Sequence, residues 1–141
     1  MKNMFFLMAF LFSCITYGQN DSIYKASMQD KINKLTLAKD FKGAASAYTD
    51  MIVDFPNDLR LVRDRGIMYI LTGNYREALP DFTKLIESNY KNMSEAYFYR
   101  GMCKYVVKID GACEDLTKSK NLGYTTDWKS FQLLCPTLSN D

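Results

Sequence analysis

The feature that most limits the fold of this chain is a repeat with a period of 34 residues. The stretch Asp81–Lys84 (Asp-Phe-Thr-Lys) matches Asp115–Lys118 (Asp-Leu-Thr-Lys) at an offset of 34, and Ala44, Ala78 and Ala112 are spaced by the same offset. Self-similarity at this period is typical of a helix-turn-helix solenoid, because one unit cannot bury its apolar face alone and stacks on the next. The sequence therefore predicts an all-α array of stacked helical units.

Composition argues against several functions before any motif is considered. The 141 residues carry 18 Lys and Arg against 16 Asp and Glu, and the formal net charge of +2 is too small to indicate a nucleic acid or an anionic membrane as partner. The chain has no histidine, so the commonest general base and metal ligand are both missing. No glycine-rich phosphate loop, nucleophilic serine elbow or metal-spaced acid cluster appears. We therefore expect neither catalysis nor a cofactor.

Residues 1–18 have the three-part pattern of a secretory signal peptide. Lys2 precedes an apolar run from Met4 to Phe12, and small and polar residues follow. The run of nine residues is shorter than the roughly 20 residues that a helix needs to span a bilayer. We expect cleavage after Gly18, export to the periplasm or cell envelope, and no transmembrane segment in the mature chain.

A lipoprotein signal is the alternative interpretation of the same leader. In this case Leu11–Cys14 (Leu-Phe-Ser-Cys) would be a lipoprotein box, and Cys14 would be acylated and become the first residue. Phe12 is bulky for that motif, which favours cleavage after Gly18. We therefore expect the mature chain to begin at Gln19 or at a lipidated Cys14, unless residues 1–18 are only a buried apolar N-terminal helix.

The spacing of motifs resembles the tetratricopeptide repeat family. The middle repeat has nearly the whole family pattern, which consists of a small residue, an aromatic, a Gly-Asn-Tyr turn, an alanine and a second aromatic. In the same order, the residues here are Gly66, Tyr69, Gly73, Asn74, Tyr75, Ala78 and Phe82. The first copy departs from the pattern with Ile32 in place of the small residue, and the third has Gly101 at an offset of 35 from Gly66. The resemblance covers residues 22–124 and implies three repeats, at about 25–57, 59–92 and 94–124.

One further helix is predicted over residues 126–135, followed by a tail at 136–141. Thr126 or Asp127 would cap this helix and Pro136 would end it. Its apolar face would consist of Trp128, Phe131, Leu134 and Cys135. Because a solenoid needs an end cap over its last apolar surface, we interpret this helix as the cap.

Downstream of the leader three cysteines remain, which allow at most one disulfide. Cys113 corresponds to Leu79 of the middle repeat, a position that should face the next unit, here the capping helix. Cys113 could therefore form a bridge with Cys135, or both could stay reduced as small buried apolar groups. Cys103 would be the unpaired cysteine. The absence of a C-x-x-C pair argues against a metal site.

The resemblance also implies where a partner would bind. In the tetratricopeptide repeat family, the first helices of successive repeats line a concave groove that holds a peptide or a partner helix. The corresponding positions here are Asn33, Arg60, Arg63, Ile67, Ile70, Phe98, Met102 and Tyr105, with Gln29 and Thr36 beside them. Two arginines and an aromatic-methionine wall would suit an apolar segment that carries an acidic group. Alternatively, the two arginines are only a solvated helix face.

The function implied by the resemblance is a non-catalytic protein–protein interaction module in the bacterial cell envelope, which would bind a peptide or protein partner in its groove. Two alternatives remain open. The chain could be a lipid-anchored structural or assembly subunit of an envelope complex, attached through Cys14. It could also be a self-associating scaffold that uses its first helix, Ile23–Ala38, because no preceding unit covers it.

Overall fold

The computed structural model describes residues 21–138, and within that range the regular structure is helical. The helices are residues 21–37, α2 (Phe41–Asp54), α3 (Leu59–Leu71), α4 (Tyr75–Glu87), α5 (Met93–Val107), α6 (Ala112–Asn121), α7 (Lys129–Gln132) and the 3-10 helix η1 (Pro136–Leu138). The signal peptide, the cleavage after Gly18 and the acylation of Cys14 lie outside the described residues.

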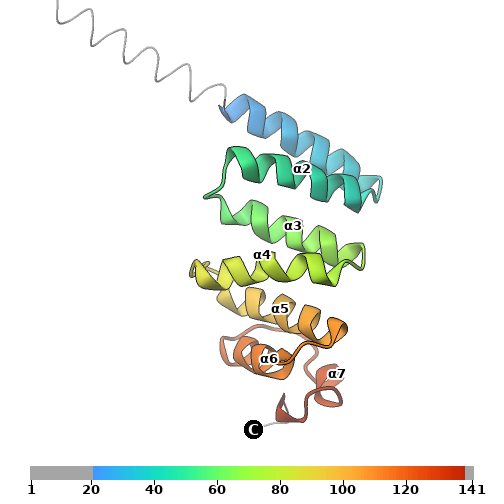
Figure 1. The fold of residues 1–141 in the computed structure, drawn as a ribbon, viewed down its shortest axis with the longest axis vertical. Coiled ribbons are helices and arrows are strands. Elements are labelled where there is room, and N and C mark those ends of the chain that lie inside the picture. The colour runs from blue at the N-terminus through green and yellow to red at the C-terminus, as the bar shows by residue number, and fades with distance from the viewer. Residues whose placement is uncertain (1–20, 139–141) are drawn as a thin grey trace, which may run out of the picture.

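The helices stack in chain order along one axis, with the first described helix and the C-terminal segment at opposite ends (Figure 1). From α2 to α6 each helix packs against the next. In chain order the helices form three successive pairs, residues 21–37 with α2, which share a core cluster, then α3 with α4, and α5 with α6. This arrangement confirms the predicted all-α solenoid.

Local sequence explains where the helices begin and end. The Asp40 carboxylate accepts a hydrogen bond from the backbone N–H of Gly43 at 2.9 Å and thereby caps α2. Asp58 caps α3 in the same way, by accepting from the N–H of Arg60 at 3.2 Å. Gly73 follows α3 with a φ of +77°, in the left-handed region that glycine adopts without steric cost. These short turns bring the two helices of each unit close together.

Two glycines allow the helices of one pair to touch. A Cβ added to Gly66 on α3 would lie 2.9 Å from the ring of Phe82 on α4. A Cβ on Gly101 of α5 would lie 3.1 Å from the carbonyl oxygen of Ala112 on α6. The family-like small residue is therefore a packing requirement at both places, and it lets Phe82 and Leu116 become buried.

The predicted capping helix over 126–135 is wrong in its extent. The chain forms only the four-residue α7 and then the three-residue η1, and between them a disulfide holds Cys135 against α6. Leu134, which we predicted on the apolar face, is 40% exposed, whereas Leu138 of the predicted tail is buried. The segment still covers the end of the array, because Leu138 and Cys135 pack with Phe98 and Leu116.

Candidate functional site

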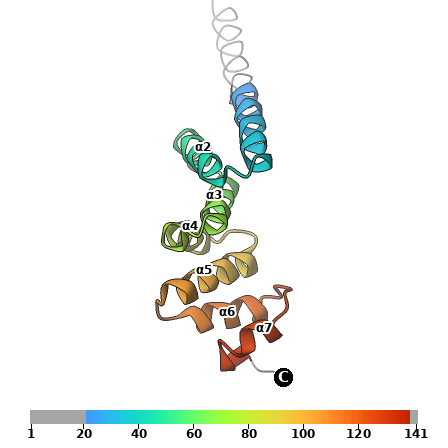
Figure 2. The same ribbon diagram turned by 90° about the vertical axis from the view of Figure 1, so that its right-hand side faces the viewer.

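The first helix and α3 lie on one side of the array, and α2 and α4 lie on the other (Figure 2). Two neighbouring hollows of about 340 and 430 Å³ open between the first helix and α3, with side chains of α2 as their floor. The first is lined by Lys25, Ala26, Gln29, Met51, Asp58, Arg60, Leu61 and Asp64, and the second by Ile32, Asn33, Thr36, Leu37, Tyr48 and Met68. We call these two hollows together the N-terminal groove.

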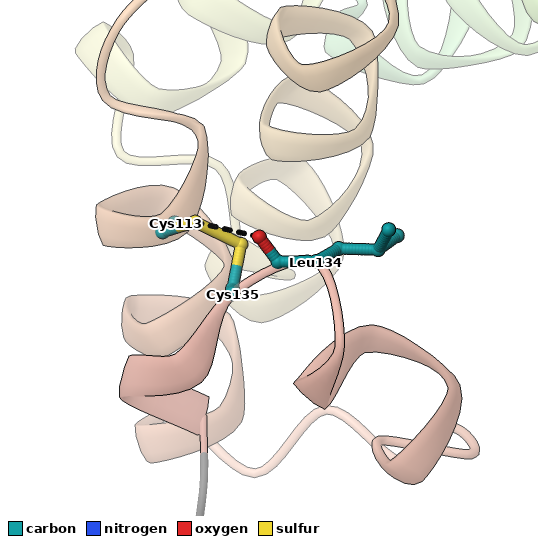
Figure 3. Close-up of a disulfide and its surroundings, with 3 residues drawn as sticks. All are labelled: Cys113, Leu134 and Cys135. Carbon is teal, nitrogen blue, oxygen red and sulfur yellow. Dashed lines mark hydrogen bonds between the residues drawn. A yellow bond between two sulfur atoms is a disulfide. The ribbon is translucent and has the colours of Figure 1, made fainter.

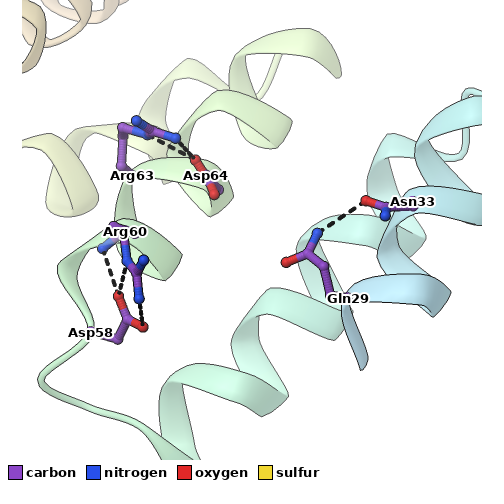
Figure 4. Close-up of polar contacts among 6 residues, drawn as sticks. All are labelled: Gln29, Asn33, Asp58, Arg60, Arg63 and Asp64. Atoms are coloured by element: carbon purple, nitrogen blue, oxygen red, sulfur yellow. Dashed lines mark hydrogen bonds and ion pairs between the residues drawn. The ribbon is translucent and has the colours of Figure 1, made fainter. Parts of the chain in front are cut away.

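Each predicted groove arginine has an aspartate partner (Figure 4). Arg60 donates two side-chain hydrogen bonds to Asp58, at 3.0 and 2.9 Å. Arg63 donates two to Asp64, at 2.8 and 2.6 Å. The hydrogen bonds from Arg60 hold the pKa of Asp58 below its ordinary value, so this carboxylate stays charged. The positive charge that the sequence places in the groove is therefore largely neutralised by local pairs.

The first helix contributes two exposed amides to the groove. Gln29 donates a hydrogen bond from Nε2 to Oδ1 of Asn33 at 3.0 Å (Figure 4), and both residues are exposed. A side-chain amide carries both a donor and an acceptor, as does the backbone of an extended polypeptide. Tyr48 lies below them, where burial raises the pKa of its hydroxyl. The groove thus combines neutral polar groups with paired charges.

The predicted site residues do not form one continuous surface. Asn33 and Arg60 line the N-terminal groove, and Arg63 lies beside it on α3. Ile67 and Ile70 are half-buried and pack against core clusters, so their contacts hold α3 in the array and are not part of the groove lining. Met102 and Tyr105 belong to α5, in the third helical pair, where Met102 is half-buried and Tyr105 is 41% exposed.

The predicted place of Phe98 on an open groove is corrected by the structure. Phe98 is only 6% exposed, because the C-terminal segment covers it. Its ring stacks on Tyr124 at a centroid distance of 4.4 Å and meets the edges of Trp128 and Phe131 at 6.0 and 5.6 Å. Aromatic contacts of this kind belong to a packed core, so Phe98 holds the end of the array together.

The sequence analysis did not identify several residues that line the groove. The Nζ of Lys25 lies 3.9 Å from the ring centroid of Phe55 and 3.8 Å from Oδ2 of Asp58. The contact with Asp58 connects the first helix to the start of α3. Asp58 was detectable in principle, because it lies two positions before the groove residue Arg60. Tyr48 comes from α2, and a comparison of first helices alone could not find it.

Cys113 of α6 and Cys135 form the predicted disulfide (Figure 3). The dashed line in that view marks the 3.9 Å approach of Cys113 Sγ to the carbonyl oxygen of Leu134. A bonded sulfur has no hydrogen to donate, so we treat this approach as a packing contact. Cys103 is buried and free of any disulfide.

Residues 21–138 show neither a metal-binding cluster nor a membrane-spanning helix. They contain no group of three or more Cys, Asp or Glu side chains arranged to hold a metal ion. Over the same residues, no helix has the length and apolar character needed to cross a membrane.

Known proteins with distant similarity include two that contain tetratricopeptide repeats. The chain is 39% identical over 82 residues to Neutrophil cytosol factor 2 of Bos taurus, which covers 57% of this chain and 15% of the relative. It is 34% identical over 76 residues to Protein SGT1 homolog of Oryza sativa subsp. japonica, covering 54% and 20%. No protein-family model matches. The chain thus spans a fifth or less of each relative's length, and the similarity supports a helical-repeat array of the tetratricopeptide kind.

Proposed function

We propose that this chain is a non-catalytic protein-interaction module that holds a segment of a partner polypeptide in the N-terminal groove. The observation that carries the proposal is the pair of adjoining hollows between the first helix and α3. Neighbouring helices already fix their walls, so the protein loses little conformational freedom when a partner binds. Similarity to two repeat-containing proteins supports the same class of function.

The groove favours a partner segment that is mostly neutral. Ile32, Leu37 and Met68 give the second hollow apolar walls, which suit one apolar side chain of the partner. The amides of Gln29 and Asn33 stand beside it and can pair with the partner's backbone. An acidic group on the partner, which the sequence led us to expect, would have to compete with Asp58 and Asp64 for their arginines.

We further propose that the protein works outside the cytoplasm, in the cell envelope. The leader pattern of residues 1–18 and the Cys113–Cys135 disulfide both support this location, because disulfides persist in oxidising compartments. Mass spectrometry of the protein from its natural host would show a first residue of Gln19, or an acylated Cys14 if the chain is a lipid-anchored subunit. A mature chain that still begins at Met1 would contradict export.

Binding in the groove is tested with one blocking variant and one matched control. Peptides selected from a random display library against the purified protein would be titrated by calorimetry into Asn33→Trp and Lys42→Trp. Asn33 is exposed and lines the second hollow, whereas Lys42 is exposed on α2 and lines neither hollow. We expect Asn33→Trp to weaken binding by about tenfold or more, at least ~1.4 kcal/mol, and Lys42→Trp to leave it unchanged. Equal affinities with unchanged circular dichroism would refute the proposed function.

A further inference from the structure

The C-terminal segment 128–138, which we call the lid, closes the last apolar surface of the array (Figure 1). Trp128, Phe131, Cys135 and Leu138 pack against Phe98 and Leu116 in one cluster. Leu116 and Leu138 are each only 1% exposed as a result. Displacing the lid would therefore expose the end of the third helical pair to solvent.

The lid has little regular structure with which to hold itself in place. It contains the four-residue α7 and the three-residue η1, and helices this short are not stable by themselves. The hydrogen bonds that tie it to the array include those from Trp128 Nε1 to the Tyr124 carbonyl and from Lys120 Nζ to the Leu138 carbonyl, both at 3.1 Å. The covalent tie is the disulfide between Cys113 and Cys135.

The two sulfurs of this disulfide differ in access. Cys135 is completely buried, whereas Cys113 is half-buried and lines a hollow of about 390 Å³ at the surface of α6. Glu114, Lys118 and Asn121, all exposed, line the same hollow. The hollow therefore gives an approach for a small thiol to Cys113, whereas Cys135 does not line it.

We propose that Cys113 is a thiol–disulfide exchange site whose reduction by a dithiol opens the lid. A thiolate of the reductant attacks Cys113 Sγ, the bond to Cys135 breaks, and Cys135 leaves as a thiolate that takes up a proton. The second thiol of the reductant then attacks the mixed disulfide and releases Cys113. Overall, two electrons and two protons pass from the dithiol to the protein, which gains two thiols while the reductant becomes a disulfide.

The site of attack is tested by trapping the mixed disulfide. A Cys103→Ser protein, in which only the bridged pair remains among the described cysteines, would be treated briefly with glutathione and quenched with N-ethylmaleimide. Peptide mass spectrometry should find glutathione on Cys113 and the alkylating group on Cys135. The reverse distribution, or equal amounts of the two, would overturn the assignment.

Opening of the lid has a built-in reporter, because Trp128 is the only tryptophan of the chain. After complete reduction with dithiothreitol, we expect the emission of Trp128 to shift to longer wavelength. Amide hydrogen exchange in the lid should become about a hundredfold faster, the gain expected when a loop of this length is no longer closed. Amides of α3 and α4 should keep their protection.

Two controls make this second test decisive. Cys103→Ser should behave as the unaltered protein does, and the double variant Cys113→Ser with Cys135→Ser should show the open-lid signals without any reductant. Unchanged Trp128 emission in protein that is verified as reduced would overturn the proposal. Loss of helical circular dichroism throughout the chain on reduction would overturn it too, because the disulfide would then hold the whole fold and not the lid.

Discussion

At the scale of single residues, a repeated ion pair between the two helices of a unit is the feature that the sequence analysis missed. Arg65 donates two hydrogen bonds to Asp81, at 3.0 and 2.6 Å, and Arg100 donates two to Asp115, at 2.8 and 2.7 Å. Asp81 and Asp115 are almost fully buried. The 34-residue offset aligns Asp81 with Asp115. It does not align their partners, because Arg65 and Arg100 are 35 residues apart on the preceding helices.

Replacing one partner of this pair should destabilise the fold. Asp81→Asn leaves the Arg65 charge without its carboxylate in a mostly buried place, and we expect a loss of about 3 kcal/mol in the free energy of unfolding. The double variant Arg65→Met with Asp81→Leu should lose clearly less, because no unpaired charge remains. Urea unfolding measures both, with exposed Asp50→Asn as the matched control. A change in Asp81→Asn no larger than that of the control would contradict a structural role for the pair.

Burial should make the Cys103 thiol unreactive in the folded protein. Burial raises the pKa of Cys103 from 9.0 to about 12. The folded state therefore keeps the thiol proton at pH values above 9.0, where the unfolded chain loses it. As a result, the contribution of Cys103 to the free energy of unfolding falls as the pH rises from 9.0 toward 12. Iodoacetamide should label Cys103 at pH 9 only after the protein is unfolded in urea. Rapid labelling of the native protein at that pH would show that the thiol is accessible.

At the scale of helices, periodicity predicts the stacked pairs well and the end of the chain poorly. Helices α3 and α4 follow from the family-like positions of Gly66 and Phe82, whose contact is local to one unit. The lid has no such period, because its shape depends on a disulfide and on Leu138, which is distant from any repeat position. The burial of Phe98 could not be predicted from the repeat either. Its cover comes from the C-terminal segment, and the alignment of the repeats' first helices contains no information on that segment.

The two packing glycines should respond differently to substitution. At Gly101, a new methyl group would meet the backbone of α6, which cannot move alone, whereas at Gly66 the nearest atom is the end of the Phe82 ring. Alanine also gains about 1 kcal/mol in helix propensity over glycine. We expect Gly101→Ala to cost about 1–2 kcal/mol in net stability and Gly66→Ala to cost less. Chemical unfolding would decide this, and a more damaging Gly66→Ala would contradict the packing described.

At the scale of the whole molecule, the two ends of the array differ. The N-terminal groove is open between the first helix and α3, while the lid closes the surface around Phe98 on α5. The resemblance implies a partner surface through all three units, whereas the N-terminal groove of the proposed function involves only the first two. Sequence reasoning could place Asn33 and Arg60 on the side where the two hollows lie, but could not predict how much of that side stays open.

Binding in the N-terminal groove is tested most directly by the footprint of a bound peptide on the backbone amides. A selected peptide would be added to isotopically labelled protein, and the shifts of the amide resonances would be mapped by nuclear magnetic resonance. We predict that the largest shifts cluster at residues 25–37 and 58–68, on the first helix and α3, and that the outer face of α4 is unaffected. Shifts concentrated on α4 and α6, with the groove unchanged, would contradict the proposed site.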